Sequence, residues 1–206
     1  MKLTPGPASI TQPTRRLVFA VIMLALTACS NDGPPWHAKD IAGVMPDLSF
    51  TLTGSDGQPV TADDYRGQVR LLFFGYTSCP DACPTTLAYL HRALQQVPAA
   101  VRDRITVLFV SVDPHRDTPE VLGQYVSLFD SHIVGLTAKE ETLRQFAKRY
   151  RTTFGYGDPD AHGQYEVSHS NAVYIFDAEG KIKLLLQTDL PTDDVARDLT
   201  RLATRS

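Results

Sequence analysis

Apolar residues recur along this chain in short blocks whose spacing alternates between that of strands and that of helices. Two blocks, 69–75 and 105–112, are nearly continuous apolar runs, which is typical of strands buried on both faces of a sheet. Between them, Leu87, Leu90 and Leu94 recur at helical spacing. The pattern therefore predicts a strand, a helix and a second strand in succession.

The remaining blocks extend this alternation toward both ends of the chain. Residues 48–52 alternate apolar and polar side chains, and Asp56-Gly57 is a turn signal, so they predict an N-terminal β-hairpin. The other predicted elements are, in chain order, a helix over 118–130 capped by Thr118 with Pro119 in its first turn, a short strand over 132–136, a helix over 139–150, an irregular insertion over 151–168, two hairpin strands over 172–176 and 182–186, and a final helix over 192–203. This order predicts an α/β fold, a mixed sheet flanked by helices on both faces, whose functional site lies beyond the carboxyl ends of the parallel strands.

The first 28 residues have the pattern of a processing signal. Basic residues precede an uncharged stretch, 17–28, that is too short to span a bilayer. Residues 26–29, Leu-Thr-Ala-Cys, match a bacterial lipobox, which predicts that Cys29 becomes the lipidated first residue. An ordinary signal peptide or an uncleaved anchor is the alternative. The pair Arg15-Arg16 matches a twin-arginine signal only in part.

These features divide the chain into three parts. We expect a lipoprotein signal peptide over 1–28, a lipidated N-terminus and polar, flexible tether over 29–45, and one folded domain over 46–206, held on the extracytoplasmic, periplasmic side of a membrane. The net charge is −3, and removal of the signal takes away only positive charge. This acidic balance argues against a nucleic-acid partner. The 43% apolar and 21% charged composition is typical of a globular domain.

Assigning Cys29 to lipid leaves Cys79 and Cys83 as a pair between a predicted strand and a predicted helix. A helix N-terminus favours thiolate over thiol, so the pair suits metal binding, redox chemistry or both. Structural zinc needs two further ligands that this spacing does not supply. Copper(I) is soft and accepts two or three ligands. A structural disulfide bond is the simplest alternative.

Three stretches resemble the Sco/SenC family of copper-delivery proteins. The signature loop of the family is similar to Gly-Tyr-Thr-Ser-Cys-Pro-Asp-Ala-Cys-Pro at 75–84. Its Asp-Pro-x-Arg-Asp-Thr-Pro stretch is similar to Asp-Pro-His-Arg-Asp-Thr-Pro at 113–119, and the segment with its histidine ligand is similar to Val-Ser-His-Ser at 167–170. The resemblance covers roughly residues 46–204, with the motifs in the family's order.

The resemblance implies a thioredoxin-like fold and one copper ion, as Cu(I) or Cu(II), held by Cys79, Cys83 and His169. It also implies a role in building the dinuclear copper centre of cytochrome c oxidase, with oxidase subunit II as the copper acceptor. The family often has His at the position of Ser78 and Asp at that of Ser168. Neither difference removes a ligand. The second leaves out a carboxylate next to His169, which bears on how the residues around the ligands set the copper affinity.

His169 also stands out by its position just before the apolar run 172–176. In thioredoxin-like oxidoreductases a proline precedes that strand and faces the cysteines, whereas this chain has no proline between Pro159 and Pro191. A histidine at that edge can approach the two thiols and complete an S₂N ligand set. A lone histidine at the start of a strand is otherwise usually a hydrogen-bonding residue.

The other polar candidates have simpler explanations. His37 in the tether and His162 in the insertion are candidates for transient copper capture, although solvated side chains explain both. Asp113 and Arg116 either orient a loop, dock a partner or form an ordinary ion pair. The remaining histidines, which we interpret as solvated, structural or near the site, are His91, His115 and His132.

Two functions use the same sulfurs. The leading hypothesis is a metallochaperone, which is not an enzyme, and the alternative is a thiol-disulfide reductase or redox sensor acting through Cys79 and Cys83. Three residues between the cysteines and a histidine in place of proline favour copper. A peroxidase is a third option, but the loop lacks the Pro-x-x-x-Thr-x-x-Cys pattern. Because only reduced cysteines bind copper, oxidation would control loading.

Overall fold

A computed structural model describes residues 1–3 and 34–205. Cys29 and most of the predicted signal peptide lie outside the described residues. Every helix and strand that the structure describes belongs to the unit Trp36–Ser206. Within the described residues, no helix has the length and apolar character needed to cross a membrane.

The centre of the fold is an eight-stranded mixed sheet with the order β1-β10-β9-β4-β5-β6-β2-β3. Its three middle strands, β4 (Val69–Gly75), β5 (Ile105–Ser111) and β6 (Ile133–Thr137), are parallel. Strands β4 and β5 are buried along their whole length, as their continuous apolar runs predict. The antiparallel strands around them are β1 (Lys39–Asp40), β2 (Thr51–Gly54), β3 (Pro59–Thr61), β9 (Val173–Phe176) and β10 (Ile182–Leu186).

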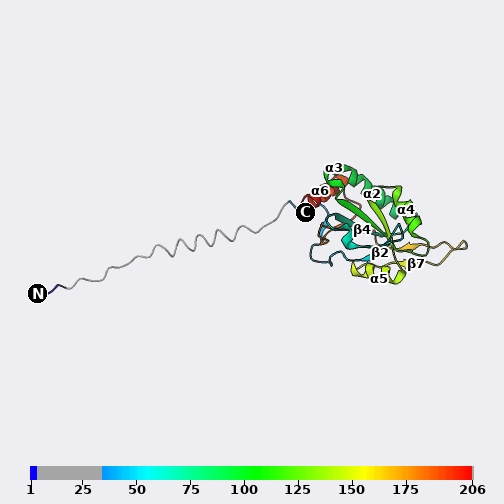
Figure 1. Ribbon diagram of the computed structural model, residues 1–206, viewed down its shortest axis with the longest axis horizontal. Coiled ribbons are helices and arrows are strands. Elements are labelled where there is room, and N and C mark those ends of the chain that lie inside the picture. Colours follow the sequence, from blue (N-terminus) through cyan, green and yellow to red (C-terminus); the bar gives the residue numbers. More distant parts are fainter. Residues whose placement is uncertain (4–33, 206) are drawn as a thin grey trace. The chain divides into compact units, whose positions relative to one another are not determined.

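Helices cover both faces of this sheet. Figure 1 shows α2 (Ala82–Gln96) and α6 (Thr192–Thr204) on one side of the sheet and α5 (Glu140–Arg149) on the other. The shorter helices are α3 (Ala99–Arg102), α4 (Pro119–Ser127) and the 3-10 turn η1 (Ala62–Tyr65). The cap of α4 is as predicted, because the Thr118 side chain accepts a bond from the Val121 N–H and Pro119 opens the helix.

The order of strands decides where the loops meet. Strand β9 runs antiparallel to β4, and Val173 pairs with Phe73 near the carboxyl end of β4. The segment before β9 therefore lies at the same edge of the sheet as the loop after β4. This register brings the His169 segment to the cysteine loop.

Several regions differ from the predicted elements. The first hairpin strand is β2 over Thr51–Gly54 rather than 48–52, and the short helix α3 was not predicted. The insertion 151–168 contains a small antiparallel hairpin of β7 (Gly155–Tyr156) and β8 (Val167–Ser168), which projects beyond the main sheet (Figure 1). The predicted tether is also packed from Trp36 onward, because β1 pairs with β10 and Ala38 is buried. The ordered body thus begins about ten residues before the expected boundary at 46.

A buried carboxylate on α6 explains the packing of residues 36–41, the N-terminal strap. Asp198 accepts the backbone N–H groups of His37 and Ala38 at 3.0 and 2.9 Å, and it also contacts the His37 ring. The guanidinium of Arg201 lies 3.8 Å from the centre of the Trp36 ring. These contacts join residues about 160 positions apart, so no local pattern reveals them.

Candidate metal centre

Cys79, Cys83 and His169 come together at the carboxyl edge of the parallel strands. Their possible ligand atoms, two Sγ and one imidazole nitrogen, all lie within 4.8 Å of one another. In the part of the chain that the structure describes, this is the one such group of histidine, cysteine and acidic side chains. The arrangement brings together the three residues that the sequence motifs selected.

The two cysteines occupy the junction of β4 and α2. Cys79 lies in the loop, and Cys83 is the second residue of α2, so the turn into the helix brings both side chains to one side. The Cys83 N–H points at Cys79 Sγ, at 3.4 Å. Both cysteines are free and buried, although Cys79 retains 9% exposure while Cys83 has none.

His169 approaches the cysteines from the segment between β8 and β9. Its Nε2 lies 3.4 Å from Cys83 Sγ, and its Nδ1 lies 3.1 Å from the Ser170 carbonyl oxygen. A carbonyl can only accept, so Nδ1 is the protonated nitrogen and Nε2 keeps its lone pair toward the sulfurs. This tautomer is the one that a metal ligand at Nε2 requires.

Burial changes the acid–base behaviour of both inner ligands. Desolvation lowers the pKa of His169, which keeps its imidazole neutral and able to donate a lone pair. Desolvation also raises the pKa of the Cys83 thiol well above its usual value. Burial of Cys83 therefore favours its thiol, in opposition to the helix N-terminus, which favours the thiolate. A bound cation would have to displace this proton.

Gly75 allows the close approach of β4 to the cysteines. A Cβ atom at this position would lie 2.8 Å from Cys83 Sγ and 2.6 Å from the Phe109 ring. Both distances are shorter than van der Waals contact. The last residue of β4 must therefore be glycine for Cys83 to pack where it does, a requirement that the sequence pattern did not reveal.

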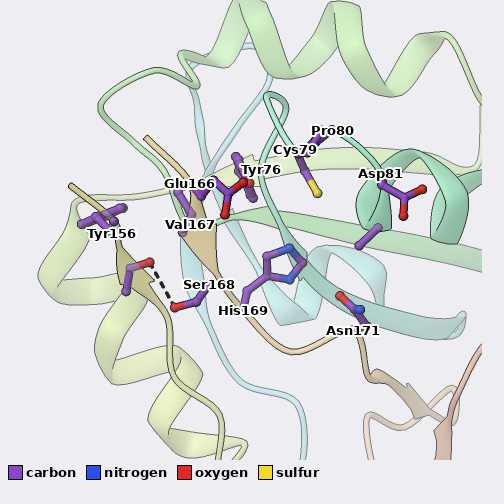
Figure 2. A pocket seen from close by; sticks show the side chains of 13 residues that line it. Tyr76, Cys79, Pro80, Asp81, Tyr156, Glu166, Val167, Ser168, His169 and Asn171 are labelled. Atoms are coloured by element: carbon purple, nitrogen blue, oxygen red, sulfur yellow. Dashed lines mark hydrogen bonds between the residues drawn. The ribbon is translucent and has the colours of Figure 1, made fainter. Parts of the chain in front are cut away.

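An open pocket of about 540 Å³ gives access to the cluster. In Figure 2 the Cys79 sulfur and the His169 ring face one another in this pocket. Asp81 and Glu166 place carboxylates on its wall, where they favour an approaching cation (Figure 2). Cys83 is absent from the lining, so an incoming group meets Cys79 and His169 first.

The two positions that depart from the family pattern lie beside the ligands. Ser78 is exposed. The Ser168 hydroxyl donates to the Gly155 carbonyl at 3.2 Å and so joins β8 to β7 (Figure 2). Ser168 thus holds the hairpin together and supplies no charge next to His169.

The other histidines bind carboxylates or lie outside the cluster. His37 lies between Asp194 and Asp198 on α6, and His115 lies 3.3 Å from Glu140. His91 and His132 both contact the carboxylate of Asp130, at 2.7 Å each. His162 is exposed in the loop between β7 and β8. Asp113 forms an ion pair with Arg116, one of the three roles considered for these residues.

The mixed sheet and the Cys₂His cluster define the class of protein: a thioredoxin-like protein with a candidate site for a soft metal ion. The family model described as SCO1/SenC matches residues 43–204. The chain belongs to the SCO1/SenC family.

Individual relatives support both the fold and the family. ScoI of Bradyrhizobium japonicum, solved with copper bound, is 33% identical with a TM-score of 0.69, covering 76% of this chain and 98% of that chain. A SCO1/SenC family lipoprotein from Bacillus anthracis is 28% identical with a TM-score of 0.66, covering 82% and 98%. The human mitochondrial SCO1 homolog is 36% identical over 133 residues, which are 64% of this chain and 44% of the human protein. This chain thus spans less than half of the human relative. The similarity to the solved Sco structures confirms the prediction of a thioredoxin-like fold.

Proposed function

We propose that this protein binds one copper ion through Cys79, Cys83 and His169 and passes it to another protein. The observation that carries the proposal is the approach of two sulfurs and one imidazole nitrogen to within 4.8 Å of one another. Two thiolates and an imidazole suit copper in both oxidation states, and they fall short of the four ligands of structural zinc. The copper-bound relative ScoI supports the choice of metal.

The geometry also supports transfer of copper rather than storage. Copper bound by three protein ligands can accept a fourth ligand from a partner protein. It can therefore be transferred to that partner by ligand exchange. Cys79 and His169 line the open pocket and are available to that partner. Cys83, which is fully buried, would hold the ion on the side away from the pocket opening. Family membership directs the proposal to the dinuclear copper centre of cytochrome c oxidase, with subunit II as acceptor.

Metal titration of the reduced protein tests this proposal. We expect one equivalent of copper per chain and weak competition by zinc. A variant with both Cys79→Ser and Cys83→Ser should lose stoichiometric binding, because it lacks the soft donors. Retention of one copper by the double variant would show that the site lies elsewhere.

The free cysteine pair supports a second candidate function, a thiol-disulfide reductase or redox sensor. His169→Ala separates the two functions, since an imidazole matters to copper but is unnecessary for thiol-disulfide exchange. The variant should keep copper(I) on two thiolates, lose most copper(II) affinity, and still oxidise and reduce its cysteines. Failed oxidase assembly in a copper-limited host would support delivery, and normal assembly despite lost copper(II) binding would support the reductase.

We also propose that a lipid on Cys29 holds the protein at the periplasmic face of a membrane, after removal of residues 1–28. The lipobox at 26–29 supports this location, and a family member from Bacillus anthracis is a lipoprotein. The remaining chain from about residue 36 is the copper-binding domain in this proposal.

A further inference from the structure

The loop between β5 and α4 contains two almost fully buried carboxylates. Asp113 has no exposed surface, and Asp117 is 1% exposed. Burial of a carboxylate is costly unless hydrogen bonds or a cation compensate for the lost water. The partners of these two groups lie on the two segments that carry the candidate copper ligands.

Asp117 holds the segment that leads into the cysteine loop. Its carboxylate accepts the backbone N–H of Thr77 at 2.9 Å and the Thr77 hydroxyl at 2.6 Å. The Ser111 hydroxyl, at the end of β5, donates a third bond at 2.5 Å. Because Thr77 stands two residues before Cys79, Asp117 fixes the start of the cysteine loop against β5.

Asp113 holds the segment that leads to His169. The Tyr165 hydroxyl donates to Asp113 Oδ1 at 2.8 Å, and Arg116 Nε donates to Asp113 Oδ2. The Arg116 guanidinium also lies 3.8 Å from the centre of the Tyr165 ring, a cation–π contact. Tyr165 precedes β8 and His169 directly follows it, so this contact restrains the strand that delivers the imidazole.

We propose that Asp113, Arg116 and Asp117, together with Tyr165, form a brace that sets the separation between the two cysteines and His169. Asp117 is its cysteine arm, and Asp113 with Arg116 and Tyr165 is its histidine arm. The inference rests on the proposed copper site, since it concerns the same three ligands. All four are positioning residues, because none belongs to the cluster of possible ligand atoms.

The brace should act differently on the two oxidation states of copper. Copper(I) is satisfied by two thiolates, whereas copper(II) prefers a larger mixed set that includes nitrogen. Loss of residues that orient a ligand typically lowers metal affinity by about 10- to 100-fold. Tyr165→Phe, which keeps the ring and loses the hydroxyl, should therefore weaken copper(II) binding by about tenfold and leave copper(I) binding nearly unchanged.

The experiment titrates both oxidation states of copper into the full chain and records the copper(II) electron paramagnetic resonance and thiolate absorption spectra. Tyr89→Phe is the matched control, because the Tyr89 hydroxyl donates at the same 2.8 Å, but to the Leu190 carbonyl outside the brace. A double variant, Tyr165→Phe with His169→Ala, completes the design. If Tyr165 acts through His169, its substitution should have no further effect once the imidazole is gone.

The expected result is a selective loss of copper(II) affinity with altered spectra in Tyr165→Phe, and wild-type behaviour in Tyr89→Phe. Equal losses in both variants, in step with lower melting temperatures, would overturn the brace, because they would reflect general destabilisation. Wild-type affinity and spectra in Tyr165→Phe would also overturn it. A wild-type chain that binds no stoichiometric copper would instead overturn the proposed function and the brace together.

Discussion

At the scale of single residues, Gly75 controls how closely β4 and Cys83 pack. We predict that Gly75→Ala displaces Cys83 Sγ or the Phe109 ring, because both lie within 3 Å of the added Cβ. Overpacking of this kind costs about 1–3 kcal/mol of stability. Chemical denaturation and copper titration measure the two effects, and both stability and copper affinity should fall.

Gly157→Ala is the control for that substitution. Gly157 lines the same pocket, but its added Cβ would come no closer than 3.4 Å to a neighbouring atom, the Glu166 carbonyl oxygen. We expect this variant to remain close to wild type in both measurements. A stable Gly75→Ala protein with unchanged copper affinity would show that Cys83 can move without consequence.

At the scale of secondary-structure elements, the Asp130 carboxylate joins three of them. It lies after α4, contacts His91 on α2 at 2.7 Å, and contacts His132 before β6 at 2.7 Å. Burial alone would raise the pKa of Asp130, but hydrogen bonds from His132 and His91 outweigh burial and lower it to about 2. Burial would lower the pKa of His132, but its bonds to Asp130 and Asp103 raise it above 6.5.

These shifts predict a pH window for the cluster. The stability that Asp130 contributes is fully present above pH 3.8, its unperturbed pKa, and is lost as the pH falls toward about 2. The stability from charged His132 is present below 6.5 and disappears as pH rises through its raised pKa. Asp130→Asn should therefore destabilise the protein most between about pH 4 and 6.5, by roughly 2 kcal/mol.

Denaturation of wild type and Asp130→Asn across this pH range tests the prediction. Asp103→Asn serves as the control, because the Asp103 side chain is 90% exposed and its loss should change stability little. A difference between wild type and Asp130→Asn that is the same at every pH would show that the charges of the cluster do not contribute.

The sequence predicted those elements whose pattern is local. The run 69–75 became β4 with the same bounds, and Thr118 caps α4, because continuous apolar runs and capping side chains act on their immediate neighbours. The hairpin β7–β8 and the N-terminal strap were not predicted. The hairpin has little apolar alternation, and the strap depends on Asp198, far away in sequence.

The same distinction applies to the site. Cys79, Cys83 and His169 could be selected from motifs, since ligand types and their spacing are visible in the sequence. Asp117 and Thr77 also lie within the motifs, but their role could not be predicted, because their hydrogen bonds join residues 40 positions apart. The raised pKa of Cys83 also depends on burial by distant side chains, which no local pattern reveals.

At the scale of the whole molecule, we predict that the protein fractionates with membranes through lipid on Cys29. Cys29→Ala should leave the precursor uncleaved at this position, because lipidation of the thiol precedes cleavage at a lipobox. Mass spectrometry of the mature N-terminus and membrane fractionation provide the measurement. A mature wild-type N-terminus without lipid would contradict the anchor.

The N-terminal strap then determines how far such an anchor lets the domain travel. With Trp36 docked, the chain from Cys29 to Trp36 can extend at most about 25 Å. The domain would diffuse within a thin layer above the lipid, and its encounters with a membrane-embedded acceptor would become a two-dimensional search. A tether free up to residue 45 would more than double that reach and dilute the domain accordingly.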